Sequence, residues 1–243
     1  MQGKKEISIK ELEDILLVHK DEKYKVFISK ICKDDIILGV RLPLVRKTAL
    51  SLIKQNYDLL SLLDKLDDNS YYEIRYCTAL AISKANLSFK DKICLIKNFF
   101  QNLNSWTIVD GFSTLLRTFI NTYKKEFFEF IKPLFDNTNP PFVRRFAIVC
   151  ANNCYCTKEY MGYLFSVFDK ADDSHYYVHM AIAWCIASMY CADKDYTIDY
   201  LKKDNLSLKT HNKAIAKITE SNIPSEEEKN FIRTLKKRSL NQK

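Results

Sequence analysis

The 243-residue sequence contains few of the residues that interrupt helices, with only four glycines and five prolines. A mixed or β-rich protein of this length needs more residues that are suited to turns. Between these scarce breakers, apolar residues recur over long segments with the spacing of an amphipathic helix. The sequence therefore predicts an all-α protein, and a hydrophobic content of 47% is enough for a sizeable core.

The sequence also lacks an apolar run that approaches the roughly 20 residues of a membrane-spanning helix. Residues 1–14 are polar and charged, unlike the apolar stretch of a signal peptide. Most of the eight cysteines lie inside apolar helical segments, where a free thiol behaves as a small hydrophobic group. We therefore expect reduced thiols and a cytoplasmic protein that does not bind membranes.

Motifs for phosphate loops and for zinc are missing as well. Without a glycine-rich phosphate loop, nucleotide hydrolysis is disfavoured. His175 and His179 are four residues apart, and Cys154 and Cys156 precede them, but this is not the spacing of a zinc site. We expect no metal site, while no local sequence favours a cysteine–histidine nucleophile pair.

Positive charge is in moderate excess, because 38 lysines and arginines face 30 acidic residues and give a net charge of +8. A basic protein of this kind favours a polyanionic partner. The segment 230–243 carries five basic residues and no acid. It is equally consistent with a solvated helix end, which favours cations.

Periodicity and capping signals predict about fourteen helices with short connections. A capping box at Ser8-Ile-Lys-Glu11 opens the first helix. In the second helix, Tyr24, Phe27, Ile28 and Ile31 form the predicted apolar face. The predicted helices cover residues 8–18, 22–32, 44–54, 57–66, 71–84, 88–101, 106–123, 126–135 (ended or kinked by its proline), 139–149, 158–169, 174–191, 196–203, 207–220 and 225–238.

A small residue followed by an apolar one recurs through the chain. The intervals between its clear occurrences are 30, 68, 34 and 33 residues, and half of the longest interval falls on Ser113. A period near 34 in paired helices indicates an α-solenoid of HEAT-like repeats, formed as one domain over residues 1–243. Its concave face would be an extended binding surface. The repeated residues are Ala49, Ala79, Ser113, Ala147, Ala181 and Ala214.

The segment 104–112 places Trp106 and Asp110 four residues apart, on one face of a helix. In one interpretation this is only a helix start, with Asn104 or Ser105 as the cap and Asp110 paired to a base. In the other, Asp110 lies in a partly apolar pocket, where its carboxylate could stabilise a developing positive charge.

Five segments, taken in order, resemble one known family, the HEAT-like-repeat DNA glycosylases of bacterial DNA alkylation repair. The resemblance extends from about residue 10 to residue 235, and its specificity comes from the order and spacing of the segments. The segments are Gly39-Val-Arg-Leu-Pro43, Tyr72-Glu73, Asn104-Ser-Trp106 with Asp110, Phe142-Val-Arg-Arg145 with the following Ala-Ile, and Met180-Ala-Ile-Ala-Trp184.

The resemblance implies an enzyme that hydrolyses the N-glycosidic bond of N3- or N7-alkylated purines in duplex DNA. The alkylated base is already cationic, so a carboxylate near the sugar, here Asp110, would stabilise the oxocarbenium character. Trp106 and Trp184 would hold the deoxyribose and the cationic base. Arg145 would contact a backbone phosphate.

The resemblance further implies a monomer that needs no cofactor and does not fully flip the base. Arg41, Arg46 and Arg144 would add positive charge to the concave face. Two other functions stay open from the sequence: a non-catalytic protein that binds branched or distorted DNA, and a HEAT scaffold that binds proteins. Asp110 separates the first function from the second, and a basic concave face separates both from the third.

Overall fold

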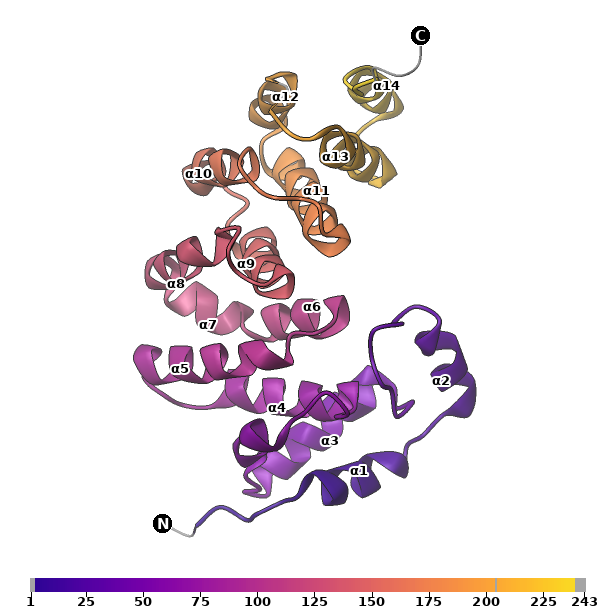
Figure 1. The fold of residues 1–243 in the computed structure, drawn as a ribbon, viewed down its shortest axis with the longest axis vertical. Helices are drawn as coiled ribbons and strands as arrows, with labels where there is room; N and C mark the ends of the chain where they lie inside the picture. Colours follow the sequence, from indigo (N-terminus) through magenta and orange to yellow (C-terminus); the bar gives the residue numbers. More distant parts are fainter. Residues whose placement is uncertain (1–2, 204, 239–243) are drawn as a thin grey trace. The chain divides into compact units, whose positions relative to one another are not determined.

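A computed structural model describes residues 3–203 and 205–238 of the chain (Figure 1). All the regular secondary structure of this described part is helical; it contains no strand, only two isolated bridges between single residues. The prediction of an all-α protein is therefore confirmed. Within the same residues, none of the helices combines the length and apolar character that crossing a bilayer requires.

The chain forms two compact units, Met1–Phe119 and Ile120–Lys243, and helix α7 (Arg117–Thr122) contains the boundary between them. The first unit contains α1 (Ile9–Leu17), α2 (Glu22–Ser29), α3 (Leu42–Lys54), η1 (Leu59–Lys65), α4 (Tyr72–Lys84), α5 (Phe89–Phe99), η2 (Phe100–Asn102) and α6 (Trp106–Leu115). The second unit contains α8 (Lys124–Ile131), η3 (Lys132–Phe135), α9 (Pro141–Cys154), α10 (Lys158–Phe168), α11 (Tyr176–Ala192), α12 (Lys194–Lys202), α13 (Leu208–Glu220) and α14 (Glu226–Thr234).

In the first unit, α4 is the central helix. Every residue from Glu73 to Ile82 is buried, so α4 is covered on all sides. It packs against α3 and α6, and the repeated small residues Ala49, Ala79 and Ser113 lie in these three helices at 0% exposure. Small side chains at these positions let neighbouring helices approach closely.

In the second unit, α11 has the corresponding central position. It packs against α9 and α13, and the repeated residues Ala147, Ala181 and Ala214 are at most 1% exposed. Each of them follows the start of its helix by five or six positions, while the three in the first unit follow by seven. The repeated pattern therefore marks equivalent, fully buried positions in both units.

Two predicted helices differ from the observed ones. The helix predicted over 106–123 is interrupted between α6 and α7. Just before the break, the hydroxyls of Ser113 and Thr114 donate to the carbonyls of Val109 and Asp110, both at 2.8 Å, and such bonds bend helices. The helix predicted over 57–66 is instead the short 3₁₀ helix η1.

The apolar face predicted for the second helix is only partly used. α2 contains no fully buried residue, and Phe27 and Ile31 are 60% and 48% exposed. Tyr24 and Ile28 are half-buried. Figure 1 shows α2 at the edge of the first unit, apart from the stacked helices α3, α4 and α5, so it has few neighbours to cover it.

Candidate functional site

Helix α6 carries Trp106 and Asp110 into the candidate site. Ser105 has extended backbone angles, and its hydroxyl accepts a hydrogen bond from the Ile108 amide at 3.3 Å. This is N-cap geometry, so of the two caps that the sequence allows, Asn104 and Ser105, the structure has Ser105. Trp106 begins the helix and Asp110 lies one turn later, and both side chains are half-buried. Their spacing places the indole and the carboxylate on one face of α6.

Two tyrosines of α4 fill the space behind this face. A Cβ atom at Gly111 would lie 3.5 Å from Tyr76 Cε2 and 3.7 Å from the Tyr72 hydroxyl oxygen. Both distances are ordinary van der Waals contacts, so α6 packs directly on these two rings of α4. Burial raises the pKa of Tyr72 well above its ordinary value, so its hydroxyl stays protonated.

Arg46 belongs to the same neighbourhood. Burial raises the pKa of Tyr76, and the nearby positive charge of Arg46 opposes that shift. The Arg46 side chain is exposed on α3. Of the predicted DNA-binding residues, Arg46 is therefore a solvent-accessible cation in the same unit as Asp110.

A half-buried carboxylate that sequence reasoning missed holds the start of α6. Asp35 accepts a short hydrogen bond from the Thr107 hydroxyl, although the two residues lie 72 positions apart. Burial raises the pKa of Asp35, while the hydroxyls of Ser105 and Thr107 lower it. The residues on both sides of Trp106 therefore interact with one carboxylate. No local pattern could have indicated this, because the partners are remote in sequence.

A pocket of about 220 Å³ opens beside Trp106 within the first unit. Its wall combines aromatic groups from Tyr24, Tyr72 and Trp106 with aliphatic side chains and the buried carboxylate of Glu73. The space suits a small apolar group more than a charged one, because Glu73 is already engaged by the backbone.

Glu73 links two of the segments that carry the family resemblance. Its carboxylate accepts hydrogen bonds from the amides of Leu38 at 3.0 Å, Gly39 at 2.9 Å and Val40 at 3.1 Å. Gly39 has a φ of +101°, which favours glycine. The segment that begins at Gly39 is thereby fixed to the start of α4.

Arg41 follows this anchored loop. Its guanidinium donates to Asp21 Oδ2 at 2.9 Å and lies 4.7 Å from the ring centre of Tyr24. The side chain is nevertheless 57% exposed. Arg41 can therefore reach an external anion from the edge of the Trp106 pocket without leaving the first unit.

In the second unit, Arg144 is held by its own chain. Its guanidinium donates a short hydrogen bond to the Asp172 carbonyl and lies 3.9 Å from the Asp172 carboxylate. Only 4% of the side chain is exposed. Burial lowers the pKa of Arg144, and the charge of Asp172 opposes this shift. Through these contacts with Asp172, Arg144 joins α9 to the segment before α11.

Arg145 and Trp184 lie on neighbouring helices of the second unit. Arg145 is 4% exposed, and its Nη1 donates to the Tyr177 carbonyl at 2.7 Å. Trp184 lies two helical turns after Tyr177 on α11, so the two face the same side. At 45% exposure, the indole of Trp184 is available to a ligand.

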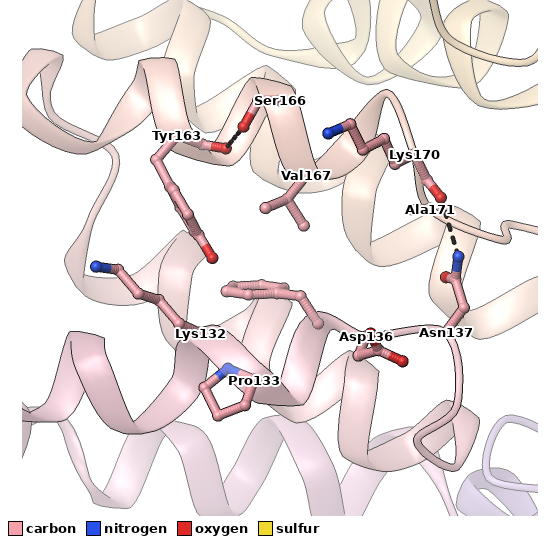
Figure 2. A pocket seen from close by; sticks show the side chains of 10 residues that line it. Lys132, Pro133, Asp136, Asn137, Tyr163, Ser166, Val167, Lys170 and Ala171 are labelled. Carbon is pink, nitrogen blue, oxygen red and sulfur yellow. Dashed lines mark hydrogen bonds between the residues drawn. The ribbon is translucent and has the colours of Figure 1, made fainter.

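The other pockets and side-chain clusters offer fewer groups suited to catalysis. The second unit contains a pocket of about 360 Å³. Lys132 and Lys170 lie on either side of it (Figure 2). Its polar groups are used internally: Asn137 donates to the Lys170 carbonyl at 3.0 Å, and Ser166 donates to the Tyr163 carbonyl at 2.7 Å. Among residues 3–203 and 205–238, no group of three or more histidines, cysteines or carboxylates is arranged to hold a metal ion.

Comparison with known proteins identifies the family of the chain. No curated protein matches the chain. The family model described as "DNA alkylation repair enzyme" matches residues 10–220, which include α6, α9 and α11 with all the candidate residues. The match covers most of the sequence, and the chain therefore belongs to the DNA alkylation repair enzyme family.

Proposed function

We propose that this protein is a DNA glycosylase that hydrolyses the N-glycosidic bond of N3- or N7-alkylated purines in duplex DNA. One observation carries the proposal: a family member presents a half-buried carboxylate, Asp110, on the same helix face as Trp106. A carboxylate in partly apolar surroundings acts more strongly on nearby charge than one in water.

In the proposed reaction, the bond between the sugar C1′ and the base nitrogen breaks, and its electron pair leaves with the base. The alkylated base is thereby neutralised, so no general acid is required. Positive charge then develops on the sugar, where the carboxylate of Asp110 stabilises it and orients the attacking water. The water adds to C1′ and loses a proton to solvent.

The aromatic residues hold the reacting nucleotide. Trp106 and Trp184 present rings whose faces attract the positive charge of the lesion and of the sugar. The exposed guanidiniums of Arg41 and Arg46 contact DNA phosphates, and Arg145 contacts a phosphate near the lesion.

We further propose that residues 1–243 form one α-solenoid of HEAT-like helix pairs, acting as a monomer with a concave DNA-binding face. Support comes from the six buried small residues and from the serial packing of α3, α4 and α6 and of α9, α11 and α13. Helices that contact only their neighbours in sequence order are typical of repeat proteins.

The decisive experiment measures release of 7-methylguanine from duplex DNA under single-turnover conditions. Asp110→Asn keeps the shape but removes the charge, so we expect a loss of roughly a hundred- to a thousandfold in rate. DNA affinity and melting temperature should stay near the parental values. Asp64→Asn is the matched control, because Asp64 is exposed on η1 of the same unit.

The alternatives give different results. If the Asp110→Asn variant excises at the parental rate, Asp110 has no part in the mechanism. Salt-sensitive DNA binding without any base release by the parent would instead indicate a non-catalytic DNA-binding protein. Absence of DNA binding even at low salt would indicate a scaffold that binds proteins.

A further inference from the structure

The exposed side of α2 carries an aromatic residue between two lysines. Lys23, Val26, Phe27 and Lys30 follow the spacing i, i+3, i+4 and i+7, which places them on one face; we call them the α2 stripe. Val26 and Phe27 are 59% and 60% exposed, and both lysines are exposed. Exposed apolar residues grouped in this way commonly mark a binding surface.

The opposite side of α2 is fixed next to the candidate site. Tyr24 and Ile28 line the pocket that contains Trp106, and Ile31, one turn after Phe27, lies at its rim. The Lys25 side chain covers Gly39, where an added Cβ would approach its Cβ to 2.7 Å. The α2 stripe is therefore the outer face of α2, while the inner face of α2 lines the pocket beside Trp106.

The charges around the stripe favour an anionic partner. Among the described residues, neither Lys23 nor Lys30 forms an ion pair in this structure. The two acids at the start of α2 are already engaged: Asp21 with Arg41 at 2.9 Å, and Glu22 with Lys20 at 2.5 Å. The stripe itself contains no acidic residue, so its cations are not neutralised locally.

We propose that the α2 stripe is a second DNA-binding element, in which Lys23 and Lys30 contact phosphates and Phe27 packs against exposed sugar or base surface. A helix rises about 1.5 Å per residue, so the two lysines start roughly 10 Å apart, one on each side of Phe27. Apolar side chains between phosphate-binding cations are a recurrent means of partly unstacking a duplex. This proposal rests on the proposed function, because it names a further contact to the same substrate.

The test combines a stacking probe with salt-dependent affinity. The full chain is titrated into a duplex that contains 2-aminopurine, whose fluorescence rises when stacking is lost. For Phe27→Ala we expect a loss of that rise and a weakening of DNA affinity by roughly five- to a hundredfold. Phe231→Ala is the control, because Phe231 is an exposed phenylalanine on α14 and should change neither signal.

The lysines are tested separately. Lys23→Gln with Lys30→Gln should reduce the slope of log affinity against log salt by about two, since each phosphate contact contributes roughly 0.9. Lys90→Gln with Lys97→Gln is the matched control, because this pair has the same seven-residue spacing on α5 and both lysines are exposed. The control pair should keep the parental slope.

Several outcomes would overturn the proposal. In the first, the parent binds DNA and releases 7-methylguanine, and the stripe variants match it in DNA affinity, salt slope and fluorescence. That result would show that α2 does not bind DNA and would leave the proposed function intact. A parent that neither binds nor excises overturns both. Binding to phosphatidylglycerol vesicles, or self-association, that Phe27→Ala abolishes without changing DNA affinity would assign the stripe to a lipid surface or to a second copy.

Discussion

The carboxylate of Asp35 accepts a hydrogen bond from the hydroxyl of Thr107, the residue directly after Trp106. The contact joins the loop that follows α2 to the first turn of α6 across 72 positions of sequence. The second carboxylate oxygen, Oδ1, is buried and has no hydrogen-bond partner among the described residues. The Asp35 carboxylate thus helps to position Trp106, but the desolvation of its Oδ1 atom costs free energy.

That cost predicts a dependence of stability on pH. Burial holds the pKa of Asp35 above its ordinary value of 3.8. The folded state therefore binds the proton more tightly than the unfolded state, and stability is lost as pH rises from the ordinary pKa through the folded one. We expect Asp35→Asn to be more stable than the parent at pH 7, by an amount that shrinks towards acid pH.

Urea unfolding of Asp35→Asn at pH 7 and at pH 4 measures this difference, with Asp34→Asn as a control on the exposed neighbouring residue. If Asp35→Asn is less stable than the parent at pH 7, and by more than at pH 4, the charge of Asp35 is favourable and our explanation is wrong. A slower release of 7-methylguanine by a well-folded variant would show that Asp35 positions Trp106.

Glu73 gives a second prediction, because its carboxylate accepts hydrogen bonds from three backbone amides. Glu73→Gln replaces one acceptor oxygen by an NH₂ group that faces these donors. The free energy of unfolding should fall by roughly 1.5–3 kcal/mol, the typical contribution of a hydrogen bond to a charged group. Glu129→Gln should change it by less than about 1 kcal/mol, because Glu129 forms only an exposed ion pair. Equal effects on the two midpoints in urea would refute an anchoring role for Glu73.

Trp184 should matter for function more than for stability. Its indole is 45% exposed, so Trp184→Ala should lower the free energy of unfolding by no more than about 1 kcal/mol. Loss of an aromatic contact to a cationic substrate should slow excision by roughly ten- to a hundredfold. Tyr176→Ala is the control on the same helix, since Tyr176 is 59% exposed. If both variants excise at the parental rate, Trp184 does not contact the substrate.

The two adjacent arginines should separate into different roles. Arg144→Met leaves the Asp172 carbonyl without its donor, so stability should fall by roughly 1–3 kcal/mol while the salt dependence of DNA binding stays unchanged. Arg145→Met should reduce the slope of log affinity against log salt by about one. A reduced slope for Arg144→Met would return Arg144 to the DNA-binding surface.

Local sequence patterns were sufficient for some of these features. A cap at Asn104 or Ser105 and the repeated small residues could be predicted, because a cap acts within one turn and a repeated small residue marks a repeated helix crossing; only the structure shows that the cap is Ser105. The break after α6 was missed, because Ser113 and Thr114 fit a helix and bend it only through their hydroxyl hydrogen bonds.

Features that depend on remote partners could not be predicted. Asp35 has no neighbour in sequence that indicates Thr107, and Glu73 binds amides 33 to 35 positions earlier. The exposure of Phe27 was missed for the related reason that a helical pattern identifies an apolar face but not whether another element covers it.

The contact of Glu73 with the loop at residues 38–40 also sets an order of events during synthesis. A ribosome releases the chain from its N-terminus, so α2 and this loop emerge well before Glu73 does. Until α4 has emerged and formed, three backbone amides of the loop lack their acceptor. The N-terminal edge of the first unit therefore cannot become native until residues well beyond it in sequence, those of α4, have been synthesised.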